Sequence, residues 1–100
     1  MYGTVARYRL KPGMHERLLA FEEEIRAAKL PGLIAEFTYR TDEDPNVYYE
    51  AIVFESEAAY QAVAHSPEQD ARYHRLLELL DEEPEWHDGT VVNADFGAQR

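Results

Sequence analysis

The stretch YGTVARYRLKPG, residues 2–13, decides the fold. Residues 2–10 alternate between two faces, which is the period-two pattern of a β-strand, and Lys11-Pro12-Gly13 then forms a turn. One face carries Tyr2, Thr4, Ala6, Tyr8 and Leu10, and the other carries Gly3, Val5, Arg7 and Arg9. We expect the first of these faces to be the one that helices cover.

A helix is predicted directly after this turn, over residues 14–29. Met14, Leu18, Phe21 and Ile25 recur at helical spacing and form an apolar stripe. The run Glu22-Glu23-Glu24 falls largely off that stripe, so we interpret it as a solvated helix face. Pro31-Gly32 ends the helix.

A hairpin follows, with strands predicted over residues 33–41 and 47–55 and a loop over residues 42–46. The second of these strands is apolar at nearly every position, and Glu50 is the residue that interrupts it. A strand that is apolar on both faces is typical of the centre of a sheet covered on both sides.

Two further helix starts and a last strand complete the pattern. Ser56 is a predicted N-cap, and Ser66-Pro67-Glu68-Gln69 predicts a second start in which Ser66 and Gln69 form a capping box. We expect a turn over residues 86–89 and a strand over residues 90–96. The order β-α-β-β-α-β indicates a ferredoxin-like α+β fold of one domain, residues 1–100, with a four-stranded antiparallel sheet and helices on one face.

The other face of such a sheet needs a cover, because it would carry Val5 and half of the apolar hairpin strand. A second copy of the same sheet is the simplest cover, so we predict a homodimer formed by sheet-to-sheet packing. Arg7 and Arg9 should lie on this face. Glu36, Arg40 and Glu50 are candidates for the same face. We expect cross-strand or cross-subunit ion pairs between the acidic and basic members of this set, the alternative being that these charges ring a solvated sheet.

Composition excludes several classes of function. The net charge of -10 disfavours binding to nucleic acid or to an anionic membrane surface. The chain has no cysteine, which removes thiolate nucleophiles and Cys-ligated metals and fits a cytoplasmic location. No apolar run is long enough to span a membrane, and the four histidines lack the spacing of a helical zinc site. We therefore expect no metal site.

Several short motifs together resemble the antibiotic biosynthesis monooxygenase family of the dimeric α/β-barrel superfamily. They are YRLKPG (8–13), LPG (30–32), VFESEAAY (53–60), SPEQ (66–69) and EWHDGTVV (85–92). The resemblance covers nearly the whole chain and implies a ferredoxin-like protomer, a sheet-to-sheet dimer and a ligand pocket between helices and sheet. These motifs mark turns and helix caps, so they are specific for the fold and weak for the function.

The resemblance also implies a type of chemistry. The family includes oxygenases that need neither metal nor flavin and act on phenolic, anthrone-like or quinol substrates, so we expect no cofactor. Such an enzyme supplies a base, an apolar pocket and hydrogen bonds to the phenolate. A second branch degrades haem with an Asn, a Trp and a His, which correspond here to Ala6, Val63 and Tyr73 and do not match. A non-catalytic dimeric module that binds a small ligand, or haem, is the alternative.

His74 and its neighbour Tyr73 are the catalytic candidates. A neutral imidazole can take a proton near pH 7, and His74 lies beside Tyr73 and Leu77 on the third predicted helix. The alternative is that His74 is a half-exposed surface residue flanked by Arg72 and Arg75.

Tyr8, Tyr60, Trp86 and Asn93 are the candidates for substrate binding. Tyr8 and Tyr60, together with Tyr73, could orient a polar aromatic ligand in one cavity, and core packing is the alternative for each. Trp86 could close the mouth of that cavity or contact the partner. Asn93, placed in the last strand, could donate an amide hydrogen bond to a substrate oxygen or face water.

Overall fold

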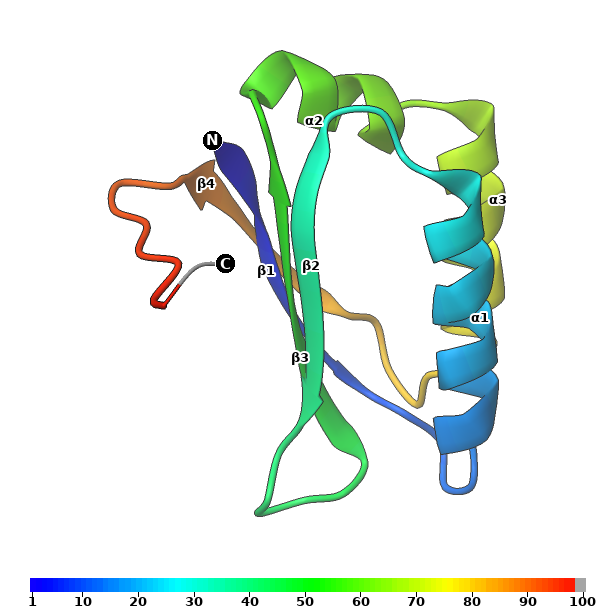
Figure 1. The fold of residues 1–100 in the computed structure, drawn as a ribbon. Coiled ribbons are helices and arrows are strands. Elements are labelled where there is room, and N and C mark those ends of the chain that lie inside the picture. The colour runs from blue at the N-terminus through cyan, green and yellow to red at the C-terminus, as the bar shows by residue number, and fades with distance from the viewer. Residues whose placement is uncertain (99–100) are drawn as a thin grey trace.

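The computed structural model describes residues 1–98 and shows a four-stranded antiparallel sheet with helices on one face (Figure 1). The elements are β1 (Tyr2–Arg9), α1 (His15–Ala28), β2 (Leu33–Arg40), β3 (Val47–Phe54), α2 (Glu57–Ala64), α3 (Pro67–Leu77) and β4 (Glu85–Thr90). The strand order β2-β3-β1-β4 confirms the predicted ferredoxin-like fold. The last two residues of the predicted domain lie outside the described residues.

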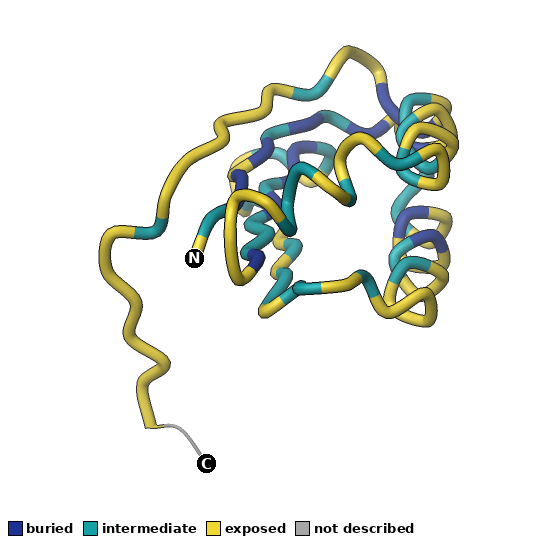
Figure 2. Tube along the Cα trace, turned by 90° about the horizontal axis from the view of Figure 1, so that it is seen from above, coloured by how far each residue is buried: buried dark blue, intermediate teal, exposed yellow. Residues whose placement is uncertain are grey.

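The opening strand and turn form as its sequence predicts. Ala6, Tyr8 and Leu10 are at most 1% exposed, whereas Val5 on the opposite face is 48% exposed. Gly13 adopts a φ of 83°, a conformation that costs glycine little, and this lets the chain reverse before α1. The hydrophobic core therefore lies between the sheet and the helices, and Figure 2 shows the buried residues gathered there.

The two later helices begin at their predicted caps. The Ser56 hydroxyl accepts a hydrogen bond from the backbone N–H of Ala59, and the Ser66 hydroxyl accepts one from the N–H of Gln69, both at 3.1 Å. The predicted capping box at α3 is only half formed, because the Gln69 side chain accepts a hydrogen bond from Arg72 instead of returning to Ser66.

The prediction of a last strand over residues 90–96 is wrong. β4 runs instead through the residues predicted as a turn, and it pairs with β1 from Glu85 opposite Arg7 to Thr90 opposite Tyr2. The last pair joins Thr90 to Tyr2, and the Val91 N–H donates a further hydrogen bond of 3.0 Å to the Met1 carbonyl oxygen. The chain then continues as an exposed segment in which Val92 is 94% exposed. Apart from Trp86, β4 is polar, and its pairing with β1 holds it in the sheet.

The face of the sheet away from the helices is apolar and open in the protomer, with Phe37 66% and Tyr39 58% exposed. Arg7 and Arg9 alternate onto it as expected. Their ion-pair partners, however, are carboxylates in loops or at the end of a strand. Arg9 forms an ion pair with Asp44, with a nitrogen–oxygen distance of 2.8 Å. Arg7 lies near Glu82 and Glu85 at 3.7 and 3.6 Å.

The prediction that Glu36, Arg40 and Glu50 share this open face is wrong. Glu50 pairs with Ala6, which faces the helices, and Arg40 pairs with Tyr48, which also does. The pairing of β2 with β3 shifts in register between Leu33 and Ala35. After this shift Glu36 lies on the helix-facing side of the sheet, as Glu50 and Arg40 do. Within residues 1–98, no helix is both long and apolar enough to cross a membrane.

Candidate functional site

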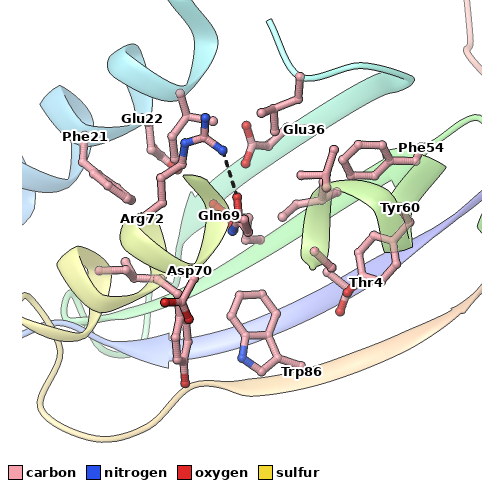
Figure 3. Close-up of a pocket in the computed structure, with 18 of the residues that line it drawn as sticks. Thr4, Phe21, Glu22, Glu36, Phe54, Tyr60, Gln69, Asp70, Arg72 and Trp86 are labelled. Atoms are coloured by element: carbon pink, nitrogen blue, oxygen red, sulfur yellow. Dashed lines mark hydrogen bonds between the residues drawn. The ribbon is translucent and has the colours of Figure 1, made fainter. Parts of the chain in front are cut away.

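A cavity of about 400 Å³ lies between the sheet and the helices (Figure 3). All seven elements contribute to its lining, from Thr4 on β1 to Asp88 on β4. This volume falls within the ~300–1,000 Å³ of typical small-molecule sites. The ferredoxin-like arrangement thus leaves a space for a ligand where the resemblance implies one.

Most of the cavity wall is apolar. Aliphatic and aromatic side chains from α1, β3 and α3 face each other across it, among them Phe21, Ile25, Ile52, Phe54 and Leu76. Apolar walls of this kind remove a flat hydrophobic ligand from water, and a few polar groups then fix its orientation.

Tyr60 lines the cavity from α2 and is held in place by β4. Its hydroxyl donates a hydrogen bond of 2.8 Å to a carboxylate oxygen of Asp88, and its ring lies edge-on to Phe54. Burial and the bond to Asp88 raise the pKa of Tyr60 to about 12, so its phenol stays protonated near neutral pH.

Tyr73 and Trp86 line the same cavity from α3 and β4, with ring centroids 6.3 Å apart. Trp86 pairs with Ala6 across the sheet, which turns its indole toward the helices. Figure 3 shows Trp86 beside the cavity, together with Thr4 and Tyr60. These aromatic groups form one end of the site.

The remaining predicted site residues lie elsewhere. Tyr8 is 1% exposed and belongs to the hydrophobic core, where its ring stacks on that of Tyr48 with centroids 6.0 Å apart. His74 is exposed on the outer side of α3, where its Nδ1 lies 2.8 Å from the backbone carbonyl oxygen of Asp70. Asn93 lies beyond β4 in the exposed segment. None of the three lines the cavity, so the structure favours the surface alternative for His74.

Three carboxyl groups that sequence reasoning placed elsewhere converge in the cavity. Oxygens of Glu22 on α1, Glu36 on β2 and Glu50 on β3 lie within 4.8 Å of one another, and we name these residues the carboxyl cluster. Glu50 is 8% exposed. The prediction that Glu22 belongs to a solvated helix face is therefore wrong. Glu22 lies between Leu18 and Ile25 on the apolar stripe, and that position is the signal that could have found it.

The carboxyl cluster is electrostatically unusual. Burial, with the nearby charges of Glu36 and Glu22, raises the pKa of Glu50 to about 9. Burial and the charge of Glu22 also raise the pKa of Glu36, although Arg26 opposes this. Glu50 is therefore protonated near neutral pH, and the cluster carries less charge than three carboxylates would.

The same three residues are the only carboxylates or histidines among residues 1–98 that lie close enough together to hold a metal ion. A hard divalent cation accepts such oxygen ligands. No histidine from this part of the chain lines the cavity, so a haem placed there would have no imidazole ligand from it.

Comparison with known families supports the architecture. The family model described as antibiotic biosynthesis monooxygenase matches residues 1–75. A search of curated proteins finds no significant match.

Several solved structures share the fold. SnoaB, a cofactor-independent oxygenase from Streptomyces nogalater, is 18% identical, with a TM-score of 0.79 over 93% of this chain and 94% of that one. A conserved protein from Methanosarcina mazei is 20% identical, with a TM-score of 0.76 over 88% and 89% of the two chains. A protein of unknown function from Nitrosomonas europaea is 22% identical, with a TM-score of 0.75 over 98% and 95%. At these identities the likeness shows the fold alone.

Proposed function

The chain belongs to the antibiotic biosynthesis monooxygenase family, and from that membership we propose that it is a cofactor-independent monooxygenase acting on a small phenolic, anthrone-like or quinol substrate. The observation that carries this proposal is the cavity, with its apolar walls, its aromatic end and its carboxyl cluster. The description of SnoaB as a cofactor-independent oxygenase on the same fold supports it by analogy.

The proposed reaction needs only the substrate and dioxygen. Loss of a proton turns a phenol or the enol of an anthrone into an electron-rich anion that can give an electron to dioxygen. For an anthrone, two C–H bonds of the reacting carbon break and a C=O bond forms there, and the second oxygen atom leaves as water. The substrate loses four electrons and dioxygen gains four, so the atoms and electrons balance.

In this proposal the protein supplies position, exclusion of water and a proton acceptor. Trp86, Tyr73 and Phe54 are placed to stack on a planar ring system, and the protonated Tyr60 hydroxyl is placed beside them as a polar group. His74, the base expected from the sequence, is exposed outside the cavity. Of the acidic residues that line the cavity, Asp88 already accepts a hydrogen bond from Tyr60, and we assign the proton-accepting role to the carboxyl cluster.

We also propose that the protein works as a homodimer in the cytoplasm. The open, apolar sheet face with Phe37 and Tyr39 is the surface that a second copy would cover. The absence of cysteine fits a reducing compartment. Neither nucleic acid nor a membrane is a proposed partner, because a chain with a net charge of -10 repels anionic surfaces.

Oxygen consumption by metal-stripped protein with a panel of anthrones, hydroquinones and catechols tests the proposed activity. We expect at least one substrate to consume oxygen faster than its uncatalysed control. Val63→Phe would place a larger side chain in the cavity and should abolish that excess. Ala62→Phe, on the exposed side of the same helix and outside the cavity lining, should leave it unchanged.

The same variants separate the enzyme from the ligand-binding alternative. Trp86 is the only tryptophan in the chain and lines the cavity, so quenching of its fluorescence reports ligand binding. Saturable quenching in the wild type that Val63→Phe removes, without oxygen consumption for any member of the panel, would support a binding module and overturn the proposed activity.

A further inference from the structure

The hydrogen bonds of the carboxyl cluster indicate that one of its members is protonated. The Thr38 hydroxyl lies within hydrogen-bond distance of a carboxyl oxygen of Glu22 and, at 3.1 Å, of one of Glu50. A threonine hydroxyl has one proton and can donate to only one of two carboxylates. The second contact is satisfied when that carboxyl is itself protonated and donates to Thr38. Because Glu50 is the most buried of the three, the proton belongs there.

Glu36 differs from the other two members of the cluster. Its side chain is not a partner of the Thr38 hydroxyl, and it lines the cavity from β2. Figure 3 shows Glu36 among the side chains that line the cavity, and an oxygen of Glu22 lies within 4.8 Å of one of its carboxyl oxygens. An ionised Glu36 is therefore a hydrogen-bond acceptor available to a ligand.

A second observation points independently to a polar ligand. The Thr4 hydroxyl oxygen is buried without a hydrogen-bond partner among residues 1–98, and Thr4, 5% exposed, lines the same cavity. The Tyr8 hydroxyl is likewise buried and without a partner there. Buried hydroxyl groups in proteins normally have partners, so an unsatisfied hydroxyl in the cavity wall, next to Tyr60, fits a cavity that takes a polar ligand.

The charges around the cavity restrict that ligand. Five acidic residues and one basic residue line it, namely Glu22, Glu36, Glu50, Asp70, Asp88 and Arg72. Arg26 from α1 also acts on Glu36, and burial together with the charges of the three cluster residues raises the pKa of Tyr8 on β1. An anionic ligand would be repelled, whereas a neutral hydroxyl can donate to a carboxylate.

We propose that the carboxyl cluster is the recognition site for a ring hydroxyl of a neutral aromatic ligand, with Glu36 accepting its hydrogen bond and with Glu22 and Glu50, which share the Thr38 hydroxyl, beside it in the cavity wall. The inference rests on the proposed function, because it names the class of substrate that the cavity selects. It identifies a neutral hydroxylated arene and excludes its carboxylated analogues.

The test is an anaerobic titration at pH 7, followed by quenching of Trp86 fluorescence, with three matched probes. They are 2-naphthol, its methyl ether, which lacks the donor hydrogen, and 2-naphthoate, which is an anion. We expect 2-naphthol to bind about tenfold more tightly than the ether, the ratio typical of a hydrogen bond to a charged group. We expect 2-naphthoate to bind more weakly than the ether.

Glu36→Leu removes the hydrogen-bond acceptor, so 2-naphthol should then bind only about twofold more tightly than the ether. Glu36→Gln keeps a neutral hydrogen-bond acceptor, so its preference for 2-naphthol over the ether should lie between those of Glu36→Leu and the wild type. This second variant keeps the test valid if Glu36→Leu fails to fold. Glu23→Leu, on the exposed side of α1, is the matched control and should keep the full preference.

Equal affinity of the wild type for 2-naphthol and the ether, or a preference that Glu36→Leu retains, would overturn the proposal. Tight binding of 2-naphthoate would overturn its restriction to neutral ligands. No oxygen takes part in these titrations, so their outcome is separate from that of the oxygen-consumption assay.

Discussion

Glu36 is the residue on which the proposed chemistry depends most. It faces the cavity from β2, its pKa is raised mainly by burial, and it adjoins a protonated Glu50. A carboxylate with a raised pKa is a stronger base than an ordinary one, which suits removal of a proton from a phenol. The residue that recognises the ring hydroxyl is thus also placed to take its proton.

Glu36→Gln should lower the catalysed rate of oxygen consumption at least about a hundredfold, because the amide cannot accept the proton. Affinity for the substrate, followed by Trp86 fluorescence, should change far less. The comparison is made with the best substrate of the panel under saturating conditions. A full rate in Glu36→Gln would remove it from the mechanism.

His74→Ala should leave both substrate affinity and oxygen consumption within about twofold of the wild type, as for an exposed surface substitution. Its imidazole lies outside the cavity and contacts only its own helix through Asp70. The oxygen-consumption assay and the Trp86 fluorescence titration measure these two quantities for His74→Ala. A large loss of rate in His74→Ala would return the role of base to the residue that the sequence suggested first.

Glu50→Gln should change how stability depends on pH. The pKa of Glu50 is about 9 in the folded chain and close to 4.5 when the chain is unfolded. Between these values the folded chain keeps a proton that the unfolded chain releases, so the wild type loses stability as pH rises. Gln has no proton to release. The free energy of unfolding of Glu50→Gln relative to that of the wild type should therefore increase by about 1 kcal/mol per pH unit between these two pKa values.

Urea unfolding of wild type and Glu50→Gln at pH 5 and pH 8 measures this difference. Glu23→Gln removes an exposed carboxyl group on α1 and serves as the control. Its free energy of unfolding should change between pH 5 and pH 8 by the same amount as that of the wild type. If the free energy of unfolding of Glu50→Gln also changes with pH by the same amount as that of the wild type, Glu50 is ionised in the folded protein and the prediction is wrong.

Element boundaries that depend on local chemistry could be predicted from the sequence. The caps Ser56 and Ser66, the Gly13 turn and the alternation of β1 all follow from neighbouring residues. β4 could not be predicted in this way. Its residues are polar and resemble a turn, and only the pairing with β1 makes them a strand.

The carboxyl cluster escaped prediction for a related reason. Its members are far apart in the chain. The irregularity in β2 and the register of β3 place Glu36 and Glu50 on one face of the sheet, and α1 packs over that face and brings Glu22 to them. Tyr60 and Tyr73 line one cavity, as the spacing of residues along their helices suggests, and Trp86 lines it too although the sequence indicated a turn there. Their roles in binding remain predictions.

Ser66→Ala should destabilise the protein by about 1 kcal/mol, because the first turn of α3 loses its cap to the Gln69 N–H. Gln69→Ala should cost less, since the side chain of Gln69 does not complete the capping box. Urea unfolding of the two variants side by side measures the difference. An equal loss in both would mean that the box forms in solution.

The whole molecule leaves one face of its sheet open, and the predicted homodimer would cover it. Phe37→Lys should convert the dimer to a monomer, because it places a charge on the apolar face in the position of its most exposed aromatic side chain. Leu19→Lys, on an exposed position of α1, should remain dimeric. Light scattering coupled to size exclusion gives the mass of each. A monomeric wild type would contradict the predicted assembly.

The family, the cavity and the carboxyl cluster together lead to one claim, that this protein inserts one atom of dioxygen into a hydroxylated or anthrone-like aromatic substrate. Mass spectrometry of the product formed under heavy-isotope dioxygen measures this, with a parallel reaction in heavy-isotope water to correct for exchange. We predict one labelled oxygen atom per product molecule, the other appearing as water without accumulation of hydrogen peroxide. A product free of label, or peroxide formed in proportion to the oxygen consumed, would contradict the claim.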